Sequence, residues 1–309
     1  MPDVVVIGAA NVDVGAVSGS PLVKGDSNPG RVGISLGGVG RNIAHNLCLL
    51  GVDTAMITVL GEDPFANVIR TSAGEIGLDL SRSAVIPGAR SSTYVFVADS
   101  TGDMALAVSD MDICRQITPA FLEERLDFIN SAKAVVIDAN LPEESISWLC
   151  GRCTAPVIAD PVSTVKAERL RGVLGKLYAF KPNRLEAERL SGISIVSEED
   201  AFAAAEKLLE TGLKQVYISL SSAGICAASG TGERARFGCP KVGIVNATGG
   251  GDAMVAALTA SLLQGDSLTE AARNAICAGA FASTAETTIH PLMSWTELKK
   301  LRDSEVYLT

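Results

Sequence analysis

The sequence predicts an α/β fold in which a mostly parallel central sheet is covered by helices on both faces. Short, uninterrupted apolar runs alternate along the chain with segments whose apolar residues recur every three to four positions. Continuous apolar strands are typical of parallel sheets that crossover helices bury on both sides. The chain has 309 residues, of which 47% are hydrophobic, so it can form one large core or two smaller ones.

Six apolar runs are the expected strands of this sheet. In chain order they are Val4–Ile7, Thr54–Val59, Ala134–Ile137, Val157–Ala159, Leu177–Phe180 and Val216–Leu220. Helices are expected between them, for instance over Ile43–Leu50, closed by Gly51, and Ala201–Leu209, closed by Gly212. Ligands of such sheets bind beyond the C-terminal ends of the strands, so we expect the functional residues to follow these runs.

Two stretches, from about Val12 to Leu36 and from Ser91 to Val108, lack helical spacing and are rich in Gly and Ser. They contain strand-like pieces such as Thr93–Val97 and Met104–Val108. We expect them to form a small antiparallel sheet, inserted into the α/β body and placed to cover a site as a lid. No low-complexity linker or internal repeat divides the chain, so one domain is expected over residues 1–309.

Charge and composition argue against several classes of function. The net charge is −9 and the cations form no run, which disfavours a broad nucleic-acid-binding surface. The N-terminus lacks the basic region of a signal peptide. The longest uncharged apolar stretch, Ala253–Gly265, is shorter than the roughly 20 residues that span a bilayer. Seven scattered cysteines are typical of reduced thiols, so we expect a cytoplasmic protein that binds neither membrane nor nucleic acid.

Cys150 and Cys153 form a C-x-x-C pair, which is compatible with a redox dithiol or half of a zinc site. The sequence has no second such pair, and its only histidines are His45 and His290. Because a structural zinc site needs about four ligands, we interpret the pair as incidental thiols at a helix end. His45 follows Asn42 in an apolar helical segment, which favours a packed residue over a ligand.

A glycine-rich turn lies between a strand expected to end at Ile244–Val245 and a helix expected from Ala253 to Leu263. Its glycines, Gly249–Gly251, let the backbone approach a ligand, with N–H groups exposed at the positive end of the helix. Asp252 follows in the first helical turn, where it either complements the helix dipole or accepts a proton. The pattern G-x-x-x-x-G-K-[ST] is absent, so this is not a P-loop. Anion-binding amides beside a carboxylate favour a phosphoryl-transfer site.

A second glycine block, G-G-V-G-R-N-I-A at positions 37–44, opens the helix that runs to Leu50. It fails as a dinucleotide-binding fingerprint, because position 43 is Ile where Gly or Ala is needed. Near the end of the first strand, Asn11 and Asp13 place an amide beside a carboxylate. That pair offers donors and acceptors for vicinal hydroxyl groups, although a polar turn after a strand is the simpler alternative.

Together these blocks resemble the ribokinase-like, PfkB family of kinases. N-A-T-G-G-G-D at 246–252 is similar to the family signature D-T-x-G-A-G-D, and G-G-V-G-R-N at 37–42 is similar to G-G-x-G-x-N. The two motifs stand about 200 residues apart in the family's order, which is more specific than either alone. The resemblance implies a ribokinase-like three-layer α/β sandwich with a β-sheet lid, and an ATP-dependent kinase that acts on an alcohol group.

The resemblance also implies roles for the matched residues. Asp252 would be the general base, and Gly249, Gly250 and Gly251 would form an anion hole. The sugar would be held by Asn11, Asp13, Gly38, Gly40 and Asn42. The nucleotide would be held by Asn183, Glu186, Ser219, Ser221, Gly224, Thr248 and Asn274. Glu186 would position Mg²⁺ through water, although Asn183 and Glu186 also match a capping box. Asn246 replaces the family's Asp beside a monovalent cation, which leaves potassium activation open.

Longer blocks extend the resemblance to the branch of the family that phosphorylates the 5′-hydroxyl of pseudouridine. They are Asp26–Gly30, Gly37–Ala44, Asp110–Ile113, Asp160–Ser163 with Lys166, and Lys181–Glu188. The resemblance places Ser92, Thr93 and Asp110 at the base. It makes Lys166 a further substrate-binding residue, with Arg41 and Lys166 as the cations that face phosphate. It also implies a homodimer through the lid. The alternatives are another sugar or nucleoside kinase, of ribokinase, adenosine or uridine type, and a nucleoside-binding regulator without turnover, which would not need Asp252.

Overall fold

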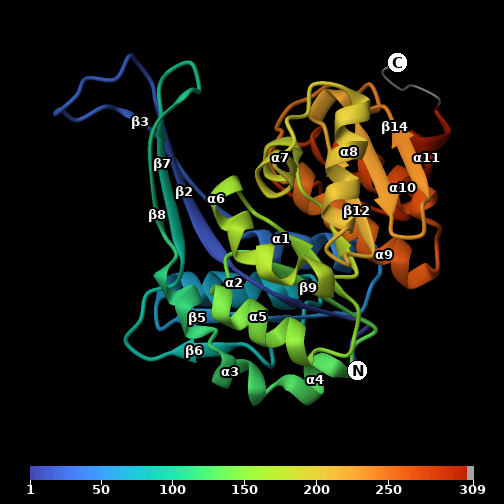
Figure 1. Cartoon of the computed structure of the whole chain (residues 1–309). Helices are drawn as coiled ribbons and strands as arrows, with labels where there is room; N and C mark the ends of the chain where they lie inside the picture. Colours follow the sequence, from blue (N-terminus) through green and yellow to red (C-terminus); the bar gives the residue numbers. More distant parts are fainter. Residues whose placement is uncertain (305–309) are drawn as a thin grey trace.

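The computed structural model describes residues 1–304, in which an eight-stranded sheet carries the fold (Figure 1). The strands lie in the order β14 (Arg234–Phe237), β13 (Ile225–Ser229), β12 (Gln215–Ser219), β11 (Ala179–Phe180), β10 (Val157–Asp160), β9 (Ala134–Asp138), β1 (Val4–Ile7) and β4 (Thr54–Ile57). From β12 to β4 every pair is parallel, whereas β13 and β14 are added in antiparallel fashion. The mostly parallel sheet that the apolar runs predicted is therefore confirmed.

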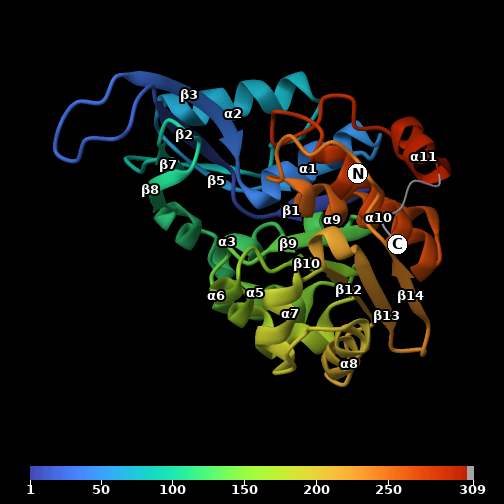
Figure 2. The same cartoon turned by 90° about the horizontal axis from the view of Figure 1, so that it is seen from above.

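Helices cover both faces of this sheet, as the view from above shows (Figure 2). One layer contains α1 (Val39–Leu49), α2 (Pro64–Glu75), α9 (Gly250–Gln264), α10 (Leu268–Ala282) and α11 (Trp295–Asp303). The other contains α3 (Pro119–Glu123), α4 (Leu126–Asn130), α5 (Glu143–Arg152), α6 (Thr164–Ala167), α7 (Arg184–Ser191) and α8 (Glu198–Leu209), with short 3₁₀ turns at Asp112–Gln116, Glu168–Lys176 and Ser221–Ala223. Alternate residues of each strand point into the two layers, so Val4 and Val6 join the first core and Val5 and Ile7 the second.

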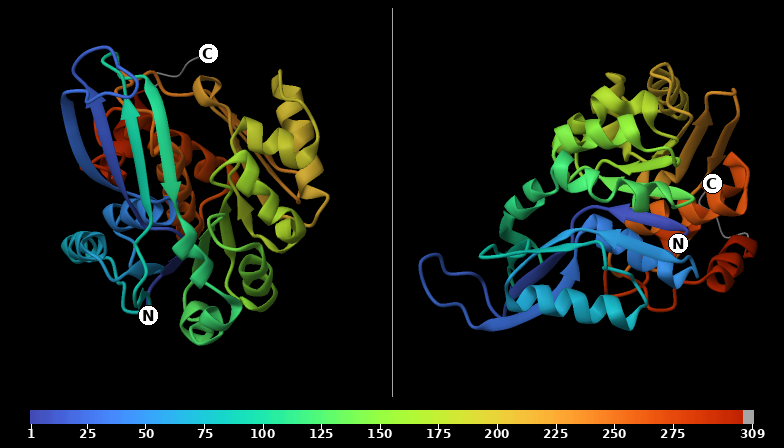
Figure 3. Two further views of the ribbon diagram at one scale, coloured as in Figure 1. Left: turned by 90° about the vertical axis from the view of Figure 1, so that its left-hand side faces the viewer. Right: turned by 90° about the horizontal axis from the view of Figure 1, so that it is seen from below.

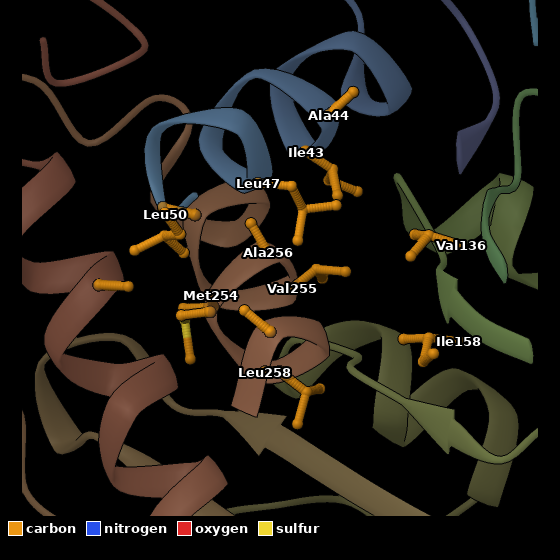
Figure 4. Packing of buried hydrophobic residues seen from close by; sticks show 14 of the residues in the cluster. Ile43, Ala44, Leu47, Leu50, Val136, Ile158, Met254, Val255, Ala256 and Leu258 are labelled. Atoms are coloured by element: carbon orange, nitrogen blue, oxygen red, sulfur yellow. The ribbon is translucent and has the colours of Figure 1, made fainter. Parts of the chain in front are cut away.

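Helix α9 lies at the centre of the first layer and is apolar almost all round. Residues 252–261 are all buried, because α1, α10 and the sheet surround them. Figure 4 shows Ile43 and Leu47 of α1 above Val255 of α9, with Val136 and Ile158 of the sheet to its right. A helix that is apolar all round belongs in a core, and this packing fixes where its N-terminus points.

A smaller sheet projects from the edge of the body (Figures 1 and 3). Its strands lie in the order β3 (Gly30–Gly37), β2 (Asn11–Ser18), β7 (Thr93–Ala98) and β8 (Met104–Asp110), and a separate pair joins β5 (Val59–Gly61) to β6 (Ala84–Ile86). The predicted small sheet is thus present in the predicted stretches. One detail differs: β2 and β7 are parallel, while the outer pairs are antiparallel. The two central strands are joined by a long connection through the body, so no hairpin forces them to be antiparallel.

The strand expected at Ile244–Val245 is wrong. The chain is irregular there, and the two side chains are 70% and 59% exposed. The backbone N–H groups of Val245 and Asn246 donate to the carbonyl oxygen of Ser283, at 2.8 and 3.1 Å. The segment therefore lies against the end of α10 and outside the sheet. The helix predicted after the glycine-rich turn is confirmed as α9.

The two cysteines of the C-x-x-C pair lie at the end of α5, as expected, and neither forms a disulfide. Burial raises the pKa of both thiols, so they are poor metal ligands and poor nucleophiles. His45 lies on α1 next to Arg41, and burial lowers its pKa to about 4. Within residues 1–304, no cluster of three or more His, Cys, Asp or Glu side chains is suited to a metal ion. In the same range no helix is long and apolar enough to cross a membrane.

Candidate active site

Polar side chains gather where four neighbouring parallel strands end at the same edge of the large sheet. Lys181 follows β11, Asp160 ends β10, Asp138 ends β9, and Asn11 follows β1 after a short turn. All four residues are buried. Buried ionisable groups at the carboxyl ends of parallel strands are typical of a ligand site, and this edge is where the sequence was expected to place one.

The N-terminus of α9 meets this edge with uncapped amides. Gly249 is its N-cap residue with φ 84°, and no side chain caps the helix. A Cβ atom at Gly249 would collide with the carbonyl oxygen of Thr288, so the turn needs glycine here. The first N–H groups of a helix have no acceptor within the helix, and they carry the positive end of its dipole. The turn is therefore suited to bind an anion.

Asp252 lies in the first turn of α9 and is buried. Its Oδ2 atom accepts a hydrogen bond of 2.9 Å from Nδ2 of Asn42. Burial raises the pKa of Asp252 to about 8, with a further increase from the negative charge of Asp160, whereas the Asn42 hydrogen bond opposes the shift. A carboxylate with a pKa close to neutrality can accept a proton during a reaction.

Asp138 holds the glycine block of the first layer in place. Its carboxylate accepts backbone N–H groups of Ala9, Gly40 and Asn140 at 2.8–2.9 Å. Gly38 has φ 97°, and a Cβ atom there would collide with the carbonyl oxygen of Ala9. The start of α1 thus packs directly on the turn after β1, and burial raises the pKa of Asp138 to about 6. This packing positions Asn42 toward Asp252.

Asn11 and Asp13 begin strand β2 and lie side by side, with Nδ2 of Asn11 donating to Oδ1 of Asp13 at 2.5 Å. They lie opposite the glycine block, because Asn11 pairs with Gly37 in the ladder. Burial raises the pKa of Asp13, and nearby Arg41 opposes that shift. The guanidinium of Arg41 donates to Oγ of Ser72 on α2, at 3.1 Å. The structure thus brings the two predicted sugar contacts together with the glycine block.

A cavity of about 540 Å³ lies between the end of β8, the turn after it and the start of α5. Ser109, Asn140, Lys166 and Arg169 contribute polar groups to its wall. Nζ of Lys166 donates to Oδ1 of Asn140 at 2.6 Å, and Asn140 is two residues beyond Asp138. The cavity therefore adjoins the edge that carries Asp138.

The cavity is lined by Lys166, a predicted substrate-binding residue, but not by the three residues predicted at the base. Asp110 instead forms an ion pair of 3.2 Å with the exposed Arg90. Oγ of Ser92 is buried 3.8 Å from the sulfur of Cys114, and Oγ1 of Thr93 donates to the Ser91 carbonyl oxygen. These contacts leave the assignments of Ser92, Thr93 and Asp110 as predictions.

The predicted pair Asn183 and Glu186 forms the capping box of α7. Oδ1 of Asn183 accepts the N–H of Glu186 at 3.0 Å, and Oε2 of Glu186 accepts the N–H of Asn183 at 2.7 Å. Glu186 is buried, which raises its pKa, and it interacts electrostatically with Asp160 and Lys181. The capping role is confirmed, and it holds the Glu186 carboxylate beside the strand ends.

The loop predicted to hold the nucleotide begins next to this helix. Ser219 ends β12 and forms a bridge with Asn183. Ser221 has φ 54° and Gly224 φ 99°, where a Cβ atom at Gly224 would meet the carbonyl oxygen of Phe237. Thr248, which was also predicted to contact the nucleotide, lies in the glycine turn before α9. Its backbone N–H donates to Oδ1 of Asn246 at 2.9 Å.

Asn274 of α10 was predicted to contact the nucleotide, but its hydrogen-bond partners do not lie at the edge of the sheet that carries Asp138 and Asp160. Its Nδ2 atom donates to Oγ of Ser261 at 2.9 Å and to Oδ2 of Asp266 at 3.3 Å, both near the C-terminal end of α9. The side chain therefore fixes α10 to the opposite end of α9 from the glycine turn. Its assignment to the nucleotide stays a prediction.

Three residues at this edge were not predicted from the sequence to be functional: Asp138, Asp160 and Lys181. Each is a charged residue that directly follows an apolar strand run, which is the available signal for a residue at this edge. The cations assigned instead were Arg41 and Lys166. In the structure, Lys181 stands next to the glycine turn, since a Cβ atom on Gly251 would lie 3.1 Å from its Nζ atom.

Comparison with known proteins identifies the class. The pfkB family carbohydrate kinase model matches residues 1–295, so the chain belongs to the PfkB family. It is a kinase, a phosphotransferase acting on an alcohol group, and kinases of this family use ATP.

Among particular relatives, the chain is 36% identical to the pseudouridine kinase of Escherichia coli strain K12 over 292 residues, which cover 94% of this chain and 93% of the relative. A carbohydrate kinase from Agrobacterium tumefaciens has a similar structure, with a TM-score of 0.87, 25% identity, and 99% and 98% of the two chains covered. The ribokinase of Arabidopsis thaliana, whose structure contains ribose and ATP, shares the fold with a TM-score of 0.86 at 21% identity, covering 97% and 98%. The ribokinase-like fold expected from the sequence is confirmed.

Proposed function

We propose that the protein transfers the γ-phosphoryl group of ATP to the 5′-hydroxyl group of pseudouridine. The observation that carries this proposal is the position of Asp252. A buried carboxylate with a pKa of about 8 stands in the first turn of a helix whose N-terminal amides are uncapped. Similarity to a pseudouridine kinase over 94% of the chain supports this nucleoside as the acceptor.

In this proposal Asp252 accepts the proton of the 5′-hydroxyl group as the hydroxyl oxygen attacks the γ-phosphorus atom of ATP. The bond between that phosphorus and the bridging oxygen breaks, and ADP leaves. The N–H groups around Gly249, Gly250 and Gly251 stabilise the negative charge on the phosphoryl oxygens during transfer. Asn42 orients Asp252 through the hydrogen bond of 2.9 Å. General-base catalysis of this kind contributes about 10²–10⁴-fold to a rate.

The ribose is proposed to lie between β2 and the start of α1. Asn11 and Asp13 would bind its hydroxyl groups, and Asn42 would contact the sugar near the 5′ end. Gly38 and Gly40 are proposed to contact the sugar through their backbone, since the absence of side chains lets this turn pack closely on Ala9 and Gly8. The side-by-side amide and carboxylate of Asn11 and Asp13 support this, since such a pair supplies both donors and acceptors.

The base is proposed to lie toward the cavity at Lys166, beneath Ser92 and Thr93. Pseudouridine exposes one ring N–H more than uridine, so a site with an acceptor for it can discriminate strongly. Asp110 is proposed as that acceptor, and it would have to leave its ion pair with Arg90, which is exposed on the surface. Exposed ion pairs contribute little energy, so this exchange would cost little.

The nucleotide is proposed to lie along the other side of the glycine turn. The contacts proposed for it are Asn183, Glu186, Ser219, Ser221, Gly224, Thr248 and Asn274. Mg²⁺ fits this end of the site, because it binds to few protein carboxylates and keeps several waters. Glu186, a buried carboxylate at the start of α7, would hold the ion through water, and the ion would neutralise phosphate charge.

The monovalent cation that the family resemblance implies does not fit the residues present. Asn246 stands where a carboxylate would be needed, and its Nδ2 atom donates to the carbonyl oxygen of Glu286 at 3.0 Å. Its Oδ1 atom accepts the N–H of Thr248. The amide therefore joins the two loops by hydrogen bonds, and it offers this position no negative charge.

The small sheet is proposed to act as a lid and as the interface of a homodimer, within a single domain over residues 1–309. Val32, Ile34, Leu106 and Val108 lie on one face of the sheet and are 61–72% exposed. The ladder places them on the face opposite to Asp13. A second copy that packs on this apolar face would leave the other face toward the nucleoside.

The test is a coupled ATP-turnover assay with pseudouridine, uridine, ribose and adenosine in parallel. The proposal predicts the highest kcat/KM for pseudouridine. A higher value for uridine, ribose or adenosine would keep the kinase class and overturn the substrate. Nucleoside binding without turnover of any of the four would favour a regulator on a kinase fold.

A further inference from the structure

The side chain of Lys181 is an uncommon feature of this site, because it is a buried lysine with a loose partner. The side chain is 6% exposed, and its Nζ atom lies 3.5 Å from Oδ2 of Asp160. Charge-assisted hydrogen bonds between such groups are usually 2.7–2.9 Å long. A buried ammonium costs free energy unless it is paired and hydrogen-bonded. Across residues 1–304, Asp160 is the one carboxylate that forms an ion pair with it.

The free side of this ammonium faces the glycine turn. A Cβ atom added to Gly251 would lie 3.1 Å from Nζ of Lys181. The charge of Lys181 also lowers the pKa of Asp252, the residue that follows Gly251. The positive charge therefore adds to the positive end of the α9 dipole at the same point. A positive charge and a helix dipole that converge beside uncapped amides are suited to bind an anion that arrives from outside.

Asp160 fixes the position of this ammonium. Its Oδ1 atom accepts the N–H of Val162 at 2.7 Å, while Oδ2 faces Lys181. Val162 has φ 65°, a conformation that costs free energy for a β-branched residue, so the surrounding structure holds this turn. Asp160 is thus a positioning residue for Lys181.

Resting on the function proposed above, we propose that Lys181 is a catalytic residue that binds the γ-phosphoryl group of ATP and follows it during transfer, with Asp160 as its positioning residue. In this chain, the glycine turn at residues 246–252 contains no lysine. The ammonium at the end of β11 supplies that charge from a neighbouring strand. Lys166 and Arg41 are held elsewhere, by Asn140 and by Ser72.

The test compares two nucleotides that differ in the γ-phosphoryl group. The binding of ADP and of AMP-PNP, an ATP analogue that does not transfer this group, is measured in Mg²⁺ by calorimetry for the wild type, Lys181→Met and Lys181→Arg. We expect Lys181→Met to weaken AMP-PNP binding by about 10-fold or more and ADP binding by less than about twofold, because the lost contact is a charge-assisted one. Lys181→Arg should lie between. Lys214→Met, at an exposed lysine, is the matched control and should leave both affinities unchanged.

Equal weakening of ADP and AMP-PNP binding, or none, would overturn the proposal. If Lys181→Met does not fold, because it leaves Asp160 unpaired, the double variant Asp160→Asn with Lys181→Met removes both charges and serves for the same comparison. Both readouts are binding measurements, so they are independent of the acceptor. Failure of the wild type to phosphorylate pseudouridine would overturn the function proposed above and leave the result for Lys181 standing.

Discussion

The two sheets of this protein differ in how completely one chain buries them. The strands β1, β9 and β10 of the large sheet are buried along their whole length. In the small sheet, most residues of β3 and β8 are exposed. The groups proposed for phosphoryl transfer stand on the buried sheet and on α9, which packs against it. The groups proposed for the nucleoside stand partly on the exposed sheet.

In the proposed function, the transfer end of the site is complete in one chain, whereas the small sheet that covers it would be completed by a second copy. At the transfer end, Asp138, Asn42 and Asp252 are held by hydrogen bonds of 2.8–2.9 Å. On the small sheet, Val14, Ile34, Val95 and Val108 align across the four strands and form an apolar row. Ile34, Val95 and Val108 are 41–62% exposed, and exposed apolar surface of this kind is suited to contact with another molecule.

The largest expected effect is at the transfer end of the site, which stands on the buried sheet and on α9. Asp252→Asn removes the proposed base and keeps the shape of the side chain, so we expect kcat to fall by about 10²-fold or more. Nucleotide affinity should stay near that of the wild type, because the uncapped amides of α9 remain. Steady-state kinetics and nucleotide titration check both parts. Wild-type turnover in this variant would remove Asp252 from its assigned role.

A smaller effect is expected on the exposed small sheet. Val108→Asp places a charge in the apolar row, so the protein should change from a dimer to a monomer in light scattering coupled to gel filtration. The KM for the nucleoside should rise by roughly 10-fold, a loss of about 1.4 kcal/mol, while kcat changes less. Val196→Asp is the matched control, since Val196 is 87% exposed and lies far along the chain, before α8. A wild-type protein that is already monomeric would contradict the dimer.

The sequence predicted the strands of the large sheet and the start of α9, for a physical reason. Apolar runs such as Val4–Ile7 and Ala134–Ile137 identify strands buried on both sides, and glycine runs mark where a helix begins at a ligand. The strand expected at Ile244–Val245 was wrong, because apolar composition alone does not distinguish a strand from an irregular segment that lies on a helix.

Pairings between distant segments could not be predicted in the same way. The parallel pairing of β2 with β7 and the approach of Lys181 to Gly251 depend on which strands become neighbours. Local patterning carries no information on that choice. For Asn274, a helical Asn matched the family, but its contacts with Ser261 and Asp266 appear only in the packed structure.

A substitution of Asn42 tests more sharply how the pKa of Asp252 is set at the transfer end. Its hydrogen bond favours the charged form of Asp252, so Asn42→Ala should raise the pKa of Asp252 further. The acid limb of the kcat/KM profile should then move to higher pH, with a several-fold loss at pH 7 that becomes smaller in alkaline buffer. An unchanged limb would show that this hydrogen bond does not tune the base.

The smallest expected effect concerns potassium. Because the Asn246 amide joins its loop to Glu286 by a hydrogen bond, we expect kcat to change by less than about twofold when KCl is replaced by choline chloride at constant ionic strength. Asn246→Asp would supply a carboxylate and should introduce a dependence on K⁺. A strong requirement for K⁺ in the wild type would contradict this interpretation of the loop.

The pH dependence of kcat/KM for pseudouridine in the wild type tests the account most directly. Asp252 must be deprotonated to accept the hydroxyl proton, and burial raises its pKa to about 8. We therefore expect kcat/KM to rise with pH through an acid limb close to 8, and this limb to be absent from the residual activity of Asp252→Asn. A limb near pH 4, or the same limb in that variant, would contradict the assignment of Asp252 as the base.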